Sequence, residues 1–231
     1  MRTIDLNADL GEGVTDDDGL LAVVTSANVA CGSHAGDEAL MRAVCSEAAA
    51  RGVAVGAQVS YDDRENFGRR HLDVPCGTLA DQIAHQVGLL GEIARACGTG
   101  VSYVKPHGAL YNRVVHDEEQ ARAVLTGSGD LPVLGLPGSV FLSLAAEAGR
   151  DYHHEGFPDR AYTPEGRLVP RDRPGAVHHE PSLIAARALE MARSGEVASV
   201  CVHGDSPAAV RSAAEVRRTL ETAGLTLRSF V

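Results

Sequence analysis

Short apolar runs rich in valine and alanine alternate along this chain with longer segments in which apolar residues return every three or four positions. The short runs have the length of buried β-strands, and the longer segments have the period of α-helices. Strands that alternate with helices form βα units and a parallel sheet. Strands are predicted at Thr3–Ala8, Ala27–Cys31, Val53–Ala57, Val101–Lys105, Val133–Leu136, Tyr152–Glu155 and Ser199–Val202.

The helical segments are clearest where one apolar stripe can be followed. One such stripe, at spacings of four, four and three, consists of Leu79, Ile83, Val87 and Leu90. Asp37 precedes another helical segment and can cap its first turn by accepting a backbone N–H. A last helix is predicted over roughly Pro207–Ala223, because Gly224 ends the pattern.

Seven βα units without a Gly/Ser-rich linker predict one α/β domain over residues 1–231. The arrangement that accommodates them best is a (β/α) barrel, seven-stranded and distorted; an open doubly wound sheet is the alternative. Two connections, Val59–Cys76 and Gly156–Pro181, are longer than compact domains usually carry. Such connections are typically lids or binding loops.

Composition excludes several classes of partner. A formal net charge of −10 and the absence of tryptophan disfavour nucleic-acid binding, and no apolar run has the length of a membrane span. The five cysteines include no C-x-x-C pair, as in proteins of a reducing compartment. The chain enters its first strand without a basic and apolar leader, so we expect a soluble, cytoplasmic protein.

Polar side chains stand where the predicted strands end and glycine turns begin. The carboxyl ends of the strands of an α/β protein lie on one face, which holds the active site. These side chains are therefore expected around one pocket: Asp9, Glu12, His34, Lys105, His107, His203 and Asp205.

The segment Lys105-Pro106-His107 is the most specific of these signals. A lysine at the end of a buried strand is costly unless it meets an anion or a carboxylate. Lys105 suits a phosphate or a developing oxyanion, and His107 is placed for proton transfer. An internal ion pair from Lys105 to Asp9 or Glu12 is the structural alternative, and it is compatible with function.

Each of the other strand ends has two interpretations. Asp9 and Glu12 are candidates for a general base or for local turn and cap hydrogen bonds. His34 precedes a capped helix, so it either meets an anion at the helix N-terminus or has a purely structural hydrogen bond. His203 is assigned to function, whereas Asp205 is either a substrate contact or a helix cap ahead of Pro207.

The long connections supply candidates for substrate binding. An arginine there can clamp a substrate carboxylate through two parallel hydrogen bonds, or it can pair with neighbouring acids of its own loop. The candidates are Arg64, Arg69, Asp159 and Arg160. A bound transition metal is left open, with Asp9, His34 and His203 as weak candidate ligands, because no short-range H-x-x-x-H pair is present.

Seven blocks of the sequence resemble the LamB/YcsF family, in order and over nearly the whole chain. They are D-L-N-A-D-L-G-E-G, S-A-N-V-A-C-G-S-H-A-G-D, D-R-E-N-F-G-R-R, V-K-P-H-G-A-L-Y-N, D-R-A-Y, L-V-P-R and V-C-V-H-G-D. The resemblance implies a barrel related to polysaccharide deacetylases. It also implies conversion of 5-oxo-L-proline to L-glutamate, driven by ATP with Mg²⁺, in a complex with two partner subunits.

This activity would need an anion holder, a base for water and an acid for the ring nitrogen. Lys105 and His34 are assigned to the anion, Asp9 or Glu12 to the base, and His107 or His203 to the acid. The sequence departs from the family at Gln58, where the family usually has a histidine; glutamine cannot take up a proton. No P-loop motif is present, so an ATP site would be unconventional or would belong largely to the partners.

Two other functions stay open. One is a metal-dependent hydrolase or deacetylase of a small amide or sugar, active without ATP. The other is a non-catalytic subunit that binds substrate or holds partners together, also as a homo-oligomer. The six ionisable groups at strand ends disfavour a scaffold, because a scaffold has no need to place costly charges there.

Overall fold

The computed structural model describes residues 2–14, 16–204 and 208–231. In these residues, parallel strands close into a seven-stranded barrel, because β1 pairs with both β2 and β7. The barrel strands are β1 (Thr3–Leu10), β2 (Ser26–Ala30), β3 (Ala54–Val59), β4 (Val101–Pro106), β5 (Val133–Gly135), β6 (Tyr152–Gly156) and β7 (Ser199–Val202). The predicted barrel is thus confirmed, and the open sheet is wrong. A two-residue strand that was not predicted, β8 (Thr226–Leu227), pairs with the start of β1.

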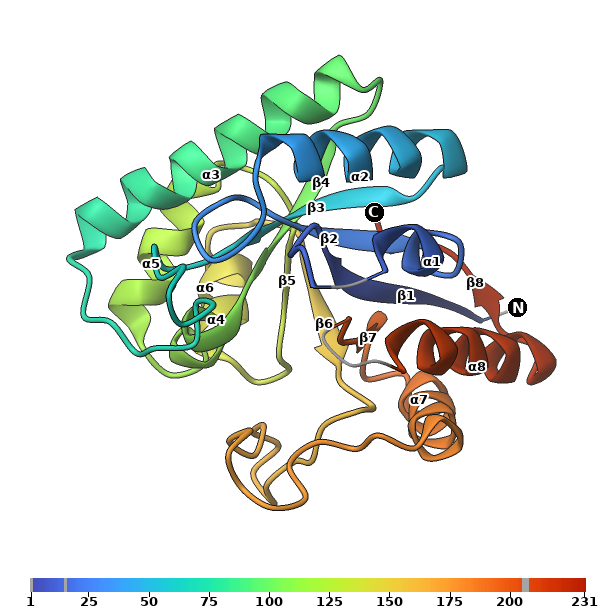
Figure 1. Cartoon of the computed structure of the whole chain (residues 1–231). Coiled ribbons are helices and arrows are strands. Elements are labelled where there is room, and N and C mark those ends of the chain that lie inside the picture. Colours follow the sequence, from blue (N-terminus) through green and yellow to red (C-terminus); the bar gives the residue numbers. More distant parts are fainter. Residues whose placement is uncertain (1, 15, 205–207) are drawn as a thin grey trace.

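The helices surround the strands, as Figure 1 shows. They are α1 (Asp17–Leu21), α2 (Glu38–Arg51), α3 (Cys76–Ala96), α4 (Gly108–Arg113), α5 (Glu118–Gly127), α6 (Val140–Glu147), α7 (Pro181–Ser194) and α8 (Ala209–Thr222). The apolar stripe predicted for α3 faces the core, with Leu79, Ile83 and Leu90 fully buried. Asp37 caps α2 as predicted, accepting a hydrogen bond from the backbone N–H of Leu40 at 2.9 Å. In the described part of the chain, no helix is both long and apolar enough to cross a bilayer.

Strand periodicity gives the barrel a polar interior. In β1, Asp5, Asn7 and Asp9 alternate with apolar residues, so all three point to the same side. Asn28 of β2 donates to the side-chain oxygens of Asn7 at 2.7 Å and Asp9 at 2.9 Å. Tyr103 in turn donates to Asn28 at 2.6 Å, so these inward polar groups form one hydrogen-bonded layer beneath the strand ends.

At the opposite end of this layer, Asp5 accepts hydrogen bonds from three hydroxyl groups: those of Thr25, Ser26 and Ser199. Burial nevertheless raises the pKa of the Asp5 carboxyl to about 6. The interior therefore contains an acid whose charge depends on pH in the mildly acidic range.

Two features of the fold shape the carboxyl ends of the strands. β1 and β3 each run two residues further than predicted, so Asp9 and Gln58 lie within strands. The connection between β6 and α7 folds back on itself through antiparallel bridges from Arg160 to Val177 and from Tyr162 to Leu168. In Figure 1 this segment projects from the ends of the strands. The helix cap predicted at Asp205 lies outside the described residues.

Candidate functional site

A cavity of about 760 Å³ opens at the carboxyl ends of the strands. It is lined by Asp9, Lys105, His107 and His203, which come from β1, β4 and the ends of β4 and β7. The folded-back connection after β6 forms another wall, with Arg160 and residues 167–172. The gathering of strand-end side chains expected from the sequence is therefore present for these four residues.

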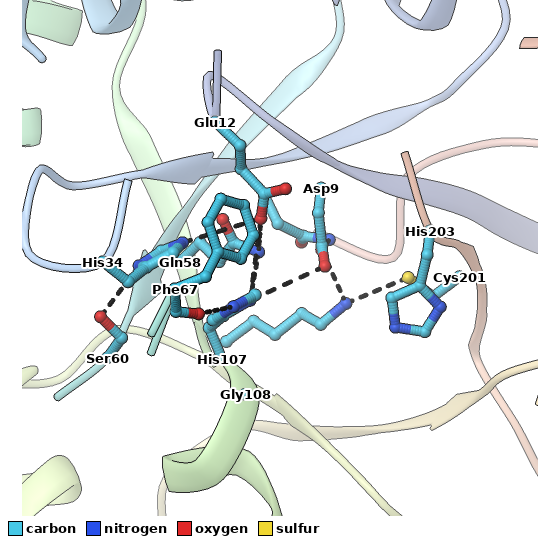
Figure 2. A network of polar contacts seen from close by, with 12 residues as sticks. Asp9, Glu12, His34, Gln58, Ser60, Phe67, His107, Gly108, Cys201 and His203 are labelled. Carbon is cyan, nitrogen blue, oxygen red and sulfur yellow. Dashed lines mark hydrogen bonds and ion pairs between the residues drawn. The ribbon is translucent and has the colours of Figure 1, made fainter. Parts of the chain in front are cut away.

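Lys105 lies at the floor of the cavity and is almost completely buried. Its ammonium is 2.8 Å from Oε1 of Glu155 and 3.2 Å from Oδ1 of Asp9, and Sγ of Cys201 is 3.1 Å away. We call Lys105, Asp9 and Glu155 the Lys105 cluster; Figure 2 shows Asp9 and Cys201 in this network. The predicted internal ion pair with Asp9 is thus formed, and Glu155 is a second partner.

The Lys105 cluster keeps its charges. Burial alone would raise the pKa of Asp9, but the ammonium of Lys105, together with His203, His107 and the hydrogen bond from Asn28, outweighs burial and holds that pKa well below the usual range. Burial alone would lower the pKa of Lys105, but the carboxylates of Asp9 and Glu155 raise it well above 10.5. Asp9 is therefore a permanent hydrogen-bond acceptor and a weak base, and the ammonium is already neutralised by two carboxylates.

A second buried group consists of Glu12, His34, Gln58 and His107, which we call the histidine cluster (Figure 2). The amide nitrogen of Gln58 donates to Oε1 of Glu12 at 3.0 Å and lies 2.8 Å from Nδ1 of His107. The two imidazole rings are stacked, with centroids 4.0 Å apart. The glutamine that replaces the family histidine thus lies at the centre of this group.

His107 is held as a neutral ring in one tautomer. Burial is the main cause that lowers its pKa well below 6.5. Its Nε2 is 3.2 Å from the carbonyl oxygen of Phe67 and must donate there, which leaves Nδ1 as the acceptor for the Gln58 amide. Both ring nitrogens are engaged, so this geometry favours an orienting role for His107 over the predicted role of acid.

The loop after β3 is shaped to cover the histidine cluster. Phe67 adopts a φ of 58°, which is rare for a bulky residue and costs backbone strain. The next residue must be glycine, because a Cβ at Gly68 would lie 2.9 Å from Cβ of His34. Strain of this kind persists only where the surroundings enforce it, and here it places the Phe67 carbonyl against His107.

His203 forms a pair with Asp159. Nδ1 of His203 is 2.8 Å from Oδ2 of Asp159, and the ring stacks on Phe157 with centroids 5.3 Å apart. Burial opposes ionisation of Asp159, but His203 lowers its pKa below the usual value. An ionised Asp159 makes Nδ1 the protonated atom of His203, so Nε2 is the ring nitrogen that can exchange a proton with a bound molecule.

The arginines predicted to bind substrate differ in their placement. Arg64 donates to the backbone carbonyls of Gly32 and Gly36, and it is not among the residues that line the cavity. Arg160 lines the cavity, but it donates to two carbonyls of its own connection, so it also holds that wall together. Arg69 lines the cavity with its guanidinium 5.1 Å from the ring centroid of Phe67.

A smaller cavity of about 390 Å³ adjoins the first and shares Arg69, Arg171 and His203 with it. Arg173, His178 and His179 add further cationic or titratable groups to its wall. Sequence reasoning treated these residues as loop residues. The signal that was available is their density between Arg171 and His179, in a connection already expected to be functional.

Sequence reasoning also missed how the site is assembled. Glu155 was only the last residue of a predicted strand, and Gln58 was only a replacement. In the described residues, the group with metal-ligand spacing is Glu12, His34 and His107, whose ligand atoms lie within 4.8 Å of one another. Of the three metal candidates named from the sequence, this group contains only His34.

Comparison with known proteins gives consistent results. The family model of LamB/YcsF matches residues 4–231. A protein of Streptomyces coelicolor, named as the A subunit of 5-oxoprolinase, is 56% identical and covers 98% of this chain and 99% of its own length. The crystal structure of a protein titled lactam utilization protein, from Thermus thermophilus, superposes with a TM-score of 0.93 at 36% identity, covering 99% of this chain and all of that chain.

More distant structures share only the fold. A polysaccharide deacetylase from Bacillus cereus covers all of this chain and 93% of its own, with a TM-score of 0.56 and 13% identity. The barrel relationship expected from the sequence is therefore confirmed at the level of architecture. With a match over almost its entire length, the chain belongs to the LamB/YcsF family.

Proposed function

We propose that this protein is the A subunit of an ATP-dependent 5-oxoprolinase, which opens the lactam ring of 5-oxo-L-proline to give L-glutamate. The similarity over the full length to a protein named as that subunit supports this function. The observation that carries it within the site is the His203–Asp159 pair beside the Lys105 cluster, because both line or adjoin one cavity of about 760 Å³. That arrangement provides proton transfer and a fixed negative charge next to space for a small substrate.

The chemistry starts from a stable amide. Transfer of the ATP γ-phosphoryl group to the lactam oxygen releases ADP and makes the ring carbon electrophilic. Water then adds to that carbon, the C–N bond opens as the ring nitrogen takes a proton, and a second water releases phosphate. Because Asp9 stays ionised, it orients the attacking water or accepts the lactam N–H rather than acting as a strong base.

His203 is the proton carrier in this proposal. Asp159 holds its Nδ1–H, so Nε2 can take a proton from water and return it to the ring nitrogen. Lys105 keeps Asp9 ionised, and His107 orients the floor of the site through Gln58 and Phe67. Glu12 and His34 act through the same cluster, away from the reacting atoms.

The two anionic substrates, 5-oxoproline and ATP, need cationic side chains in the cavity walls. The carboxylate of 5-oxoproline is assigned to Arg69 or Arg171, which line both cavities. The phosphates of ATP, with Mg²⁺, are assigned to the smaller cavity, where Arg173, His178 and His179 line the wall together with those two arginines. Two partner subunits complete the enzyme, and the reduced cysteines and the use of ATP fit a cytoplasmic location.

The test is release of glutamate from 5-oxoproline by the assembled complex, with and without ATP. We expect ATP-dependent turnover that is lost with His203→Gln and retained with His85→Gln, a matched change at an exposed position of α3. No turnover from the complete set of subunits would reject the function. Full activity of His203→Gln would reject the proton-transfer assignment alone.

A further inference from the structure

The histidine cluster contains more hydrogen-bond acceptors than donors. Oε1 of Glu12, Nε2 of His34 and Nδ1 of His107 converge within 4.8 Å of one another. The three residues are 6%, 1% and 7% exposed, so bulk water does not supply the missing donors. Buried acceptors need donors, and three that converge on one point compete for few of them.

The tautomers of the two histidines follow from their outer contacts. Nε2–H of His107 donates to the carbonyl of Phe67, which leaves a lone pair on Nδ1. Nδ1 of His34 is 2.9 Å from Oγ of Ser60, and that hydroxyl donates to the carbonyl of Tyr61. His34 must therefore donate from Nδ1, so its Nε2 also carries a lone pair toward the cluster.

One amide provides the only donors assigned to the three acceptors among the described residues. The NH₂ group of Gln58 serves Glu12 at 3.0 Å and His107 at 2.8 Å. Nε2 of His34 is left without a hydrogen-bond partner, 3.7 Å from the carboxylate oxygen of Glu12. Oε1 of Gln58 is buried without a partner as well. Two unpartnered acceptors thus lie at one place, and a cation would satisfy both.

We propose that Glu12, His34 and His107 bind a divalent transition-metal ion of the zinc class, with Gln58 as the fourth ligand. A half-turn of the Gln58 amide places Oε1 where Nε2 now lies. The donor set is then two imidazoles and one carboxylate, which are ordinary zinc ligands, with a neutral amide oxygen in the fourth position. The site is independent of the proposed lactam-opening activity.

The separations between the ligand atoms fit one ion. Zinc bonds to nitrogen and oxygen of 2.0–2.1 Å imply ligand–ligand separations of about 3.3 Å in a tetrahedron. Four of the six separations are 2.8 and 3.0 Å from the Gln58 nitrogen, 3.7 Å from His34 to Glu12 and 3.8 Å from His107 to Glu12. They lie on both sides of this value, but the two imidazole rings are stacked with an angle of 13° between their planes, so one ring must turn for both lone pairs to meet at one ion.

The outer contacts are also those of a metal site. A histidine ligand usually donates its second N–H to a carbonyl, carboxylate or water, which fixes the ring orientation. His107 has the carbonyl of Phe67 and His34 has the hydroxyl of Ser60 in this role. The strained φ of Phe67 and the close packing of Gly68 on His34 are explained if this loop must deliver that carbonyl.

The site provides four protein ligands, as structural zinc sites do. It would join the loops after β1 and β2 to β3 and to the end of β4, and thereby fix His107 beside Asp9. Oδ2 of Asp9 is 3.9 Å from Nδ1 of His107, and both residues line the cavity, so the ion would lie close to the cavity floor.

The experiment uses the full chain with any affinity tag removed, stripped with a chelator and then exposed to Zn²⁺ or Co²⁺. We expect one ion per chain by elemental analysis and a Co²⁺ absorption spectrum of a tetrahedral nitrogen and oxygen site. At free Zn²⁺ 100-fold above the Kd, the Tm should rise by about 5 to 10 °C. Stoichiometry well below one ion per chain, with an unchanged Tm, overturns the proposal.

Variants separate this site from adventitious binding. Glu12→Gln and His34→Gln should each weaken Zn²⁺ binding by at least about 100-fold, whereas His85→Gln on the surface of α3 should bind as the parent does. Gln58→His, which offers imidazole in place of the amide, should bind Zn²⁺ more tightly than the parent. Equal binding by all four variants assigns the ion elsewhere and overturns the proposal. If a ligand variant fails to fold, the Co²⁺ spectrum of the parent and the Gln58→His comparison decide.

Discussion

The Lys105 cluster and the histidine cluster lie side by side at the strand ends, yet they solve the problem of buried polar groups in opposite ways. In the Lys105 cluster, one ammonium meets two carboxylates, and the pKa shifts of Lys105 and Asp9 keep these two groups charged. In the histidine cluster, the groups are acceptors, and a single neutral amide serves two of them. Among the described residues, a cation meets both carboxylates in the first cluster, although Oε2 of Glu155 is buried without a hydrogen-bond partner; in the second, no cation meets the buried acceptors. Both clusters reach the cavity, the first through Asp9 and Lys105 and the second through His107.

The largest effect is expected from removing the cation of the Lys105 cluster. Lys105→Met leaves Asp9 and Glu155 buried without their partner, which should lower the free energy of unfolding by about 3–5 kcal/mol. Turnover by the assembled complex should fall at least about 100-fold. Urea unfolding and glutamate release measure the two effects.

A triple variant controls for this result. Adding Asp9→Asn and Glu155→Gln to Lys105→Met removes the uncompensated charges, so stability should recover in part while activity stays low. If the free energy of unfolding of the single variant falls by less than about 1 kcal/mol, the Lys105 cluster does not depend on its ion pairs. The contrast between the two clusters would then disappear.

The next largest effect concerns the proton carrier beside the Lys105 cluster. Asp159→Asn removes the charge that holds Nδ1–H of His203 and should lower turnover about 100- to 1,000-fold. The pH profile of turnover should change as well, because the imidazole of His203 no longer has an ionised carboxylate as its partner. Asp130→Asn, at an exposed position, is the matched control. Unchanged turnover in Asp159→Asn would show that His203 does not need this partner.

The third prediction uses pH to test the layer beneath the Lys105 cluster. The pKa of Asp5 is raised from 3.8 to about 6, so the folded state binds the proton more tightly than the unfolded state. This contribution to stability is present below about pH 4 and is lost as the pH rises through about 6. Its size, from a shift of about two pKa units, is about 3 kcal/mol.

Asp5→Asn isolates this contribution. The parent should lose about 3 kcal/mol of unfolding free energy relative to the variant between about pH 4 and pH 7. Urea unfolding of both proteins across this range measures the difference. A constant difference would mean that the three hydroxyl donors keep Asp5 ionised throughout.

The smallest effect is expected in the histidine cluster. Gln58→Ala removes the amide that serves Glu12 and His107, and it should lower the free energy of unfolding by about 1–3 kcal/mol. Saturating Zn²⁺ should raise the Tm of Gln58→Ala less than that of the parent, because one ligand is missing, whereas Lys105→Met keeps all four ligands and should gain as much as the parent. Thermal unfolding with and without the ion measures both. Equal gains in Tm by the two variants would mean that Gln58 is not a ligand of the ion.

Much of this site could be predicted because it depends on local rules. The alternation along β1 places Asp5, Asn7 and Asp9 on one side, and parallel strands bring their carboxyl ends together. A lysine at the end of a buried strand requires an acidic partner, and Asp9 was named for it. The same rules say nothing about which distant residue arrives beside it, so Glu155 was missed.

The sequence by itself determined the βα alternation and the face on which the polar residues gather, because these follow from hydrophobic period and strand direction; closure of the barrel was its favoured prediction, which the β1–β2 and β1–β7 pairings settled. Only the tertiary structure decided the pairings: Glu155 with Lys105, Asp159 with His203, and Gln58 between Glu12 and His107. Each joins residues from different βα units, and their contact depends on barrel closure and strand register. A side chain that reads as a lost histidine in the sequence is, in three dimensions, the centre of a cluster.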